Sequence, residues 1–224
     1  YLSGERAALR GLDARPERVE AACDASLRRL GTDVIDVFYL HRVDPNVPIE
    51  DTYGAMARLV EKGKVRALGL CEVGPKTYAR AAGIHPVAVV QSEYSLWSRE
   101  PEDGMLRFLR EQGSWFFGYA SLGRGILSGA VRKPEDLPAG DQRRDMPRFQ
   151  GENFYKNIEL VKLLEAMAEE LGIKSAQLPL AWCGRNGDAT PIVGVTEPGH
   201  VREAQEAVAL TLPEQTWRQL DEVF

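Results

Sequence analysis

The stretch Val34-Ile-Asp-Val-Phe-Tyr-Leu-His-Arg-Val-Asp-Pro45 decides the fold expected of this chain. An apolar, β-branched run of strand length ends abruptly in three polar residues, His41, Arg42 and Asp44. Such a run is typical of a strand that is buried on both faces of a parallel sheet. A β/α barrel keeps its chemistry at the carboxyl ends of its strands, so the stretch indicates a site as well as a fold.

Helical and strand patterns alternate along the rest of the chain. We expect strands near residues 34–40, 65–70, 87–93, 114–120 and 190–195. We expect helices near residues 16–30, 49–62, 75–83, 101–112, 153–171, 175–186, 198–208 and 213–223. This alternation favours parallel βα units in a single domain over residues 1–224. Because a closed barrel needs eight strands, the five strands leave two architectures open: a complete doubly wound sheet, or part of a barrel.

Charge and composition narrow the classes of partner. The 224 residues carry a formal net charge of −5, which argues against nucleic acid and anionic membranes. No apolar run approaches the roughly 18 residues that span a bilayer, and the first residues lack a signal-peptide core. The three cysteines are far apart and have no metal-ligand spacing. We therefore expect a reduced, cytoplasmic protein without a metal site.

Four motifs occur in register along the chain: Leu40-His41-Arg42-Val43-Asp44-Pro45, Gly63-Lys64-Val65-Arg66-Ala67-Leu68-Gly69-Leu70, Gln91-Ser92-Glu93-Tyr94-Ser95 and Tyr119-Ala120-Ser121-Leu122-Gly123-Arg124-Gly125. With them the chain resembles the aldo-keto reductases from about residue 12 onward, and it resembles only the C-terminal two thirds of that family. The resemblance implies a (β/α)8 TIM barrel, with five of its eight βα units in this chain. It also implies NADPH as the cofactor and hydride transfer to the carbonyl group of a small aldehyde or ketone.

His41 is the catalytic residue that the resemblance implies. Family members use a tyrosine, an aspartate, a lysine and a histidine, and the first three belong to the part of the family before this chain's first residue. We therefore expect His41 to orient the substrate carbonyl, and the chain alone to be catalytically incomplete. The alternative is a structural histidine, hydrogen-bonded where its strand ends.

The resemblance also implies a set of cofactor-binding residues. Gln91 matches the residue that binds the nicotinamide carboxamide, with Cys71 and Glu72 beside it, and Tyr119 matches the aromatic residue that stacks on the ring. The pyrophosphate would lie on the loop formed by Ala120, Leu122, Gly123, Arg124 and Gly125, where backbone N–H groups allow close approach. The alternatives are a strand-end glutamine that caps a loop, a core tyrosine and a solvated arginine.

Several residues depart from the family pattern. Cys71 replaces a serine or asparagine, and Ala120 replaces a serine. Near the 2′-phosphate position Thr196 and His200 stand in a segment without lysine or arginine, and His200 takes the place of an arginine. The remaining departures are Pro179 and Ala204. Losing these cations weakens recognition of a 2′-phosphate, so we expect NADP(H) with NAD(H) as the alternative.

The long connection at about residues 122–152 carries three arginines, Arg143, Arg144 and Arg148. They either recognise an acidic group or lie in a solvated loop with ion pairs to nearby carboxylates. Those carboxylates are Asp141, Asp145 and Glu152.

Three hypotheses for function follow. The first is an NADP(H)-linked aldo-keto reductase, and the second is a non-catalytic relative that binds a ligand or regulates a partner. The third is an unrelated doubly wound enzyme that uses His41, Asp44 and Glu93. We also expect self-association, because an incomplete barrel exposes the edges of its first and last strands.

Overall fold

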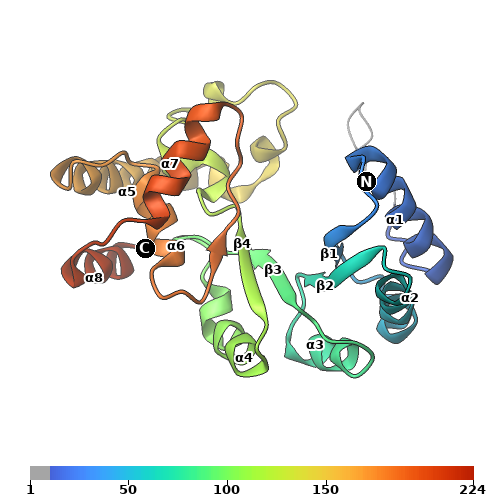
Figure 1. Cartoon of the computed structure of the whole chain (residues 1–224). Helices are drawn as coiled ribbons and strands as arrows, with labels where there is room; N and C mark the ends of the chain where they lie inside the picture. The colour runs from blue at the N-terminus through green and yellow to red at the C-terminus, as the bar shows by residue number, and fades with distance from the viewer. Residues whose placement is uncertain (1–10) are drawn as a thin grey trace. The chain divides into compact units, whose positions relative to one another are not determined.

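The computed structural model describes residues 11–224, and its contacts divide the chain into two compact units. Unit 1 comprises residues up to Ser92 together with Arg107–Phe116, and unit 2 comprises Glu93–Leu106 and Phe117–Phe224. The five strands follow one another in the sheet in their chain order. The parallel α/β fold expected from the sequence is therefore confirmed (Figure 1), whereas the single domain stays a prediction.

The helices and strands of unit 1 alternate. They are α1 (Pro16–Leu30), β1 (Ile35–Leu40), α2 (Ile49–Glu61), β2 (Val65–Cys71), α3 (Pro75–Ala82) and β3 (Val89–Glu93). Pro16 opens α1 at a position where its missing N–H costs nothing, and Gly31 ends it in a left-handed conformation. The strands β1, β2 and β3 pair in parallel, with Ile35 opposite Val65 and Gly69 opposite Val89.

Unit 2 has more irregular chain than unit 1. It contains η1 (Glu100–Asp103), η2 (Gly123–Ser128), η3 (Pro134–Asp136), η4 (Gln142–Asp145), η5 (Pro147–Phe149), α5 (Gly151–Glu170), α6 (Gln177–Gly184), β5 (Thr190–Pro191), α7 (Pro198–Val208) and α8 (Glu214–Val223). Three elements cross the boundary between the units: β3, whose last residue Glu93 belongs to unit 2, α4 (Met105–Gln112) and β4 (Trp115–Tyr119). The β4–β5 pair is parallel, with Phe117 opposite Thr190.

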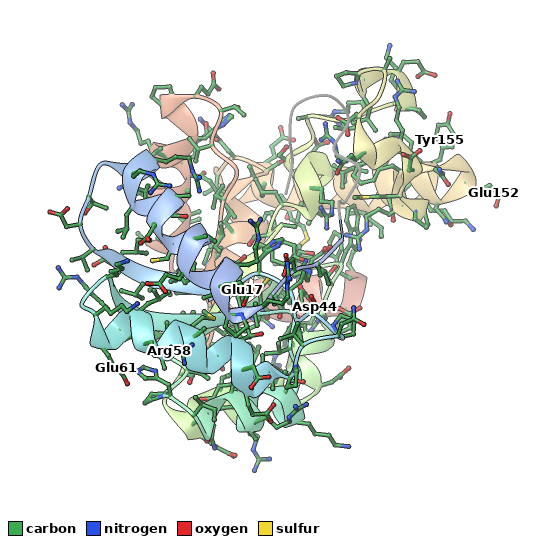
Figure 2. The ribbon with its side chains drawn as sticks, turned by 90° about the vertical axis from the view of Figure 1, so that its right-hand side faces the viewer. Glu17, Asp44, Arg58, Glu61, Glu152 and Tyr155 are labelled. Carbon is green, nitrogen blue, oxygen red and sulfur yellow. The ribbon has the colours of Figure 1, made fainter. Side chains whose placement is uncertain are left out.

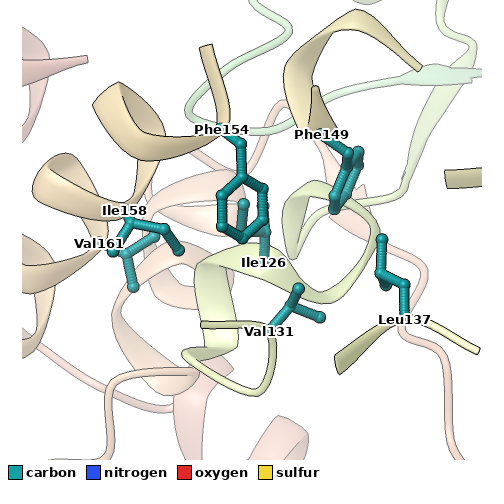
Figure 3. Packing of buried hydrophobic residues seen from close by; sticks show 7 residues of the cluster. All are labelled: Ile126, Val131, Leu137, Phe149, Phe154, Ile158 and Val161. Carbon is teal, nitrogen blue, oxygen red and sulfur yellow. The ribbon is translucent and has the colours of Figure 1, made fainter. Parts of the chain in front are cut away.

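The long connection folds around a core of its own. Ile126, Val131, Leu137 and Phe149 are buried there against the inner side of α5 (Figure 3). The outer side of α5 carries Tyr155, which is exposed (Figure 2). Burying these apolar side chains offsets the entropy of ordering so many residues, and it explains why the connection is not a spacer.

Four expectations about the elements were wrong in detail. The strand at β5 has two residues instead of six, and β3 begins at Val89 instead of Val87. The helix expected at 101–112 is divided into η1 and α4 at Gly104, whose positive φ interrupts it. The β1 strand is not buried on both faces: Asp36 is exposed, and only Leu40 is fully buried. The reason is that the described strands flank β1 on one side only.

Candidate active site

The carboxyl ends of the three strands of unit 1 present one row of side chains. Cys71 on β2 lies opposite Gln91 on β3, and Leu40 on β1 lies opposite Leu70, so His41 follows beside Cys71. Residues opposite one another on neighbouring strands point to the same face of a sheet. Within the row, Cys71 Sγ contacts Gln91 Oε1 at a distance of 3.9 Å. Strand register therefore brings Cys71 and Gln91 together, and His41 directly follows the end of the neighbouring strand β1.

The layer beneath this row depends on a glycine. Tyr39, Gly69 and Val89 are opposite one another, two residues before the row. A Cβ atom at Gly69 would lie 2.6 Å from the Tyr39 ring and 3.1 Å from Val89 Cγ1. Gly69 thus makes room for the Tyr39 ring beneath the row, and burial raises the pKa of the Tyr39 hydroxyl.

Cys71 sits in the row as a buried thiol. Arg42 Nη1 lies 2.9 Å from its sulfur and also donates a hydrogen bond to the His41 carbonyl oxygen. Burial raises the pKa of the Cys71 thiol, and the Arg42 guanidinium opposes that shift. The thiol is therefore protonated at neutral pH, and it offers only a weak hydrogen bond where a hydroxyl or amide would offer a strong one.

His41 is exposed at the end of β1. Partial desolvation lowers the pKa of its imidazole, and the neighbouring Arg42 guanidinium lowers it further. The ring is therefore neutral at pH 7, with one nitrogen that donates a hydrogen bond and one that accepts. The loop after His41 is anchored by the buried Asp44 (Figure 2), which accepts hydrogen bonds from the N–H groups of Ala14 and Asn46.

The turn after β4, in unit 2, has an unusual backbone. Ala120 and Arg124 have φ values of 55° and 59°, and Gly123 and Gly125 between and beside them also have positive φ. Among residues 11–224 the third non-glycine residue with positive φ is Glu72, directly after β2. Such conformations cost free energy in L-residues and gather at functional sites. All three of these residues were predicted to bind the cofactor, and backbone of this kind directs N–H groups into an anion-binding concavity.

Tyr119 ends β4, and its carbonyl oxygen accepts the Tyr94 N–H at 3.1 Å, which joins the end of the strand to the segment after β3. Leu122 begins the following tight turn by accepting hydrogen bonds from the N–H groups of Gly125 and Leu127. The predicted pyrophosphate residues are thus contiguous and held by local hydrogen bonds.

The arginines of the connection are held by carboxylates and carbonyls. Arg143 pairs with Asp141 at 2.7 Å, as expected. Arg148 does not pair with the carboxylates near it in sequence but with Glu93, 3.3 Å away on β3. Arg144 donates to the carbonyl oxygens of Leu137 and Pro138. The expectation of a solvated loop with local ion pairs is therefore correct for Arg143 only.

Thr196 and His200 lie together before and within the first turn of α7. Thr196 Oγ1 is 3.3 Å from His200 Nδ1, and His200 Nε2 is 3.1 Å from the Glu197 carboxylate. A carboxylate here repels a phosphate and accepts hydrogen bonds from hydroxyl groups. These side chains therefore fit a ribose hydroxyl better than a 2′-phosphate.

Sequence reasoning gave Glu93 no part in a nucleotide site. In the structure Glu93 is the acceptor for Arg124 at 2.7 Å as well as for Arg148. The spacing of Glu93 could have indicated such a part. Glu93 follows Gln91 by two residues on a strand, and alternate residues of a strand share a face.

The donor groups can be tested against a nicotinamide dinucleotide. Gln91 supplies an amide for a carboxamide, and the turn at 120–125 supplies N–H groups and the Arg124 guanidinium for a pyrophosphate. Each of these groups by itself suits one part of a dinucleotide, whereas the Glu197 carboxylate does not suit a 2′-phosphate. In residues 11–224 no cluster of histidine, cysteine, aspartate or glutamate has the arrangement of a metal site. Within the same residues, no helix has both the length and the apolar character needed to cross a membrane.

Parallel strands alternating with helices, with polar groups at the carboxyl ends of the strands, are the arrangement of the β/α-barrel class. The model of the Aldo/keto reductase family matches residues 8–224, and the chain belongs to that family. The fold class predicted from the four motifs is thereby confirmed.

Two relatives show how far the likeness extends. The aldo-keto reductase yakc of Schizosaccharomyces pombe, which is named for NADP(+), is 43% identical over 215 residues, 94% of this chain and 63% of its own length. The glycerol dehydrogenase AKR11B4 of Gluconobacter oxydans is 27% identical with a TM-score of 0.87, over 94% of this chain and 64% of its own. This chain thus spans slightly less than two thirds of both relatives.

A third protein shares the fold. The thermostable aldo-keto reductase Tm1743, solved in complex with the inhibitor epalrestat, is 24% identical with a TM-score of 0.75. The match covers 94% of this chain and 68% of that one.

Proposed function

We propose that this chain forms the nicotinamide-nucleotide and carbonyl-binding surface of an NADP(H)-linked oxidoreductase that interconverts aldehydes or ketones and alcohols. The observation that carries the proposal is the row of His41, Cys71 and Gln91 at the carboxyl ends of three consecutive parallel strands. Family membership and the name of the yeast relative, which includes NADP(+), support it.

Each residue in the row has a chemical task. The nucleotide, when bound, supplies or accepts hydride. Gln91 would hold the carboxamide. Tyr119 is outside the row, at the end of β4, and by the family resemblance it would cover one face of the ring. The neutral His41 would donate a hydrogen bond to the carbonyl oxygen, which polarises the carbonyl without adding a positive charge to the site. Cys71 would contribute little to carboxamide binding, because its thiol is a weak hydrogen-bonding group.

NAD(H) is a second candidate nucleotide. The contact between His200 and the Glu197 carboxylate favours it, because a carboxylate suits a ribose hydroxyl and repels a 2′-phosphate. Thr196 would lie beside the same ribose. The cytoplasmic location and self-association through strand edges stay predictions, the first in accord with three free cysteines in residues 11–224.

Calorimetric titration with NADPH and NADH tests the proposal without requiring turnover. We expect saturable binding, weakened by Gln91→Leu and unchanged by Gln112→Leu, a matched substitution on the exposed end of α4. No saturable binding of either nucleotide at millimolar concentration would refute the proposal.

His41 needs a separate assay, because its role concerns the carbonyl. If turnover of a reactive aldehyde is measured, His41→Ala should lower kcat while nucleotide affinity is retained, and His85→Ala should change neither. Nucleotide binding without turnover in any variant would agree with a catalytically incomplete chain and equally with the non-catalytic alternative, a binding or regulatory member of the family.

A further inference from the structure

Glu93 joins three separate parts of unit 2. One carboxylate oxygen accepts a hydrogen bond from Arg124 Nη2 at 2.7 Å. The other accepts from Ser98 Oγ at 3.0 Å and from Arg148 Nη1 at 3.3 Å. Arg148 Nη2 is also 3.3 Å from Ser98 Oγ. One carboxylate at the end of β3 therefore contacts both the turn after β4 and the long connection.

The cluster carries more positive than negative charge in a partly buried place. The side chains of Glu93, Arg124 and Arg148 are 21%, 35% and 29% exposed. Two guanidinium groups face one carboxylate, so this set keeps an excess of one positive charge. Partial burial strengthens each of these interactions relative to an ion pair on the surface.

Arg124 is fixed at its backbone as well as at its side chain. Its φ of 59° lies in the left-handed region, between two glycines that also have positive φ. Arg143 donates a hydrogen bond to the Arg124 carbonyl oxygen at 2.9 Å, and Asp141 holds Arg143 from the other side. A costly backbone conformation persists only where the surroundings determine it, and the contacts with Glu93 and Arg143 do so here.

We propose that Glu93 is a positioning residue for the nucleotide: by holding Arg124 and Arg148 it fixes the turn at 120–125 in the conformation that binds the pyrophosphate. Glu93 itself does not contact the nucleotide. The carboxylate keeps the two guanidinium groups together, and the excess positive charge attracts the anion. This inference rests on the proposed function, because it concerns the same nucleotide.

Two ligands and two substitutions separate positioning from a general structural role. Glu93→Gln keeps the shape of the side chain and removes its charge. We expect it to raise the dissociation constants of both NADPH and ADP-ribose about ten-fold, the usual scale for losing one charge-assisted hydrogen bond. Gln91→Leu should weaken NADPH alone, because ADP-ribose has a pyrophosphate but no nicotinamide. Glu159→Gln, whose carboxylate pairs with Lys162 on the exposed side of α5, is the matched control and should change neither ligand.

A double-mutant cycle shows whether Glu93 acts through Arg124. If it does, Arg124→Gln should raise the dissociation constant of ADP-ribose much less in the Glu93→Gln background than in the wild type. Arg148→Gln provides a second route if Glu93→Gln lowers the melting temperature strongly. It leaves the pair of Glu93 with Arg124 in place, removes the excess charge, and should reduce both ADP-ribose affinity and its dependence on salt.

The outcomes are distinguishable. ADP-ribose affinity within about two-fold of the wild type in both Glu93→Gln and Arg148→Gln would overturn the inference and leave the proposed function standing, since two-fold is only ~0.4 kcal/mol. Tighter binding by Glu93→Gln would also overturn it, because the carboxylate would then be a competitor of the nucleotide. A wild-type chain that binds neither ligand would refute both proposals.

Discussion

Replacing Gly69 by alanine should lower the free energy of unfolding by about 1–3 kcal/mol, the usual range for overpacking a core. The added Cβ would lie 2.6 Å from both Cδ1 and Cε1 of Tyr39. This is ~0.9 Å inside the optimal separation of about 3.5 Å between carbon atoms. Val89 Cγ1 stands 3.1 Å away on the other side, so the methyl group cannot escape toward β3.

Gly54 provides the matched control for this substitution. It lies within α2, and a Cβ there would have no atom nearer than 3.9 Å. Gly54→Ala should therefore stabilise the chain by about 0.5–1 kcal/mol, because alanine loses less backbone entropy than glycine in a helix. Urea unfolding followed by circular dichroism measures both variants, and for a chain of this size 1 kcal/mol shifts the melting temperature by about 2–4 °C.

Second-site changes identify Tyr39 as the cause. Tyr39→Leu should relieve much of the cost of Gly69→Ala, whereas Tyr39→Phe should not, because phenylalanine keeps the ring that the methyl group meets. A Gly69→Ala variant within about 0.5 kcal/mol of the wild type would refute the reasoning, since that is the range of neutral surface substitutions. Because the same layer supports the row at the strand ends, Gly69→Ala should also weaken nucleotide binding.

Three further predictions concern unit 2. Ala120→Gly should raise stability by up to about 1 kcal/mol, measured by urea unfolding, because glycine adopts a φ of 55° without strain. Trp182→Phe should cost about 1–3 kcal/mol in the same assay, since it deletes a buried indole N–H that donates to α8 at 3.0 Å, while Trp115→Phe at an exposed position should be neutral. The Arg143 hydrogen bond lowers the pKa of Asp141 from 3.8 to about 2, so its stabilising contribution is present above pH 3.8 and is lost as the pH falls toward 2. The difference in melting temperature between the wild type and Asp141→Asn should accordingly shrink as the pH falls from 3.8 toward 2, and a difference that stays constant over this range would contradict the assignment.

Elements with a strong local pattern could be predicted from the sequence. The helix α7 was expected at the residues where it lies, and α1 was bounded correctly by Pro16 and Gly31, because capping and periodicity are local properties. The length of the β5 strand was overestimated. Its apolar run continues past Pro191, but strand length depends on how far the neighbouring strand continues to pair, which no local pattern reports.

The row at the strand ends could be anticipated for a related reason. Parallel strands in chain order bring their carboxyl ends to one edge, so His41, Cys71 and Gln91 needed only a correct register. The pairing of Arg148 with Glu93 could not be anticipated, because 55 residues separate the partners and nearer carboxylates compete in any local reading. The buried apolar residues of the long connection follow no helical or strand period, so their common core was invisible in the sequence.

The stacking around Trp182 gives the molecule an optical probe of its own. The guanidinium of Arg185 lies 3.9 Å from the centre of the Trp182 ring, and that of Arg99 lies 5.0 Å from it. This indole is fully buried in unit 2, whereas Trp115 in unit 1 is 65% exposed. Emission from Trp182 should therefore be blue-shifted and insensitive to iodide, and emission from Trp115 should be red-shifted and readily quenched. Unit 2 also contains the half-buried Trp97 and Trp217, so comparison of the wild type with Trp115→Phe isolates the emission of unit 1 without attaching a dye.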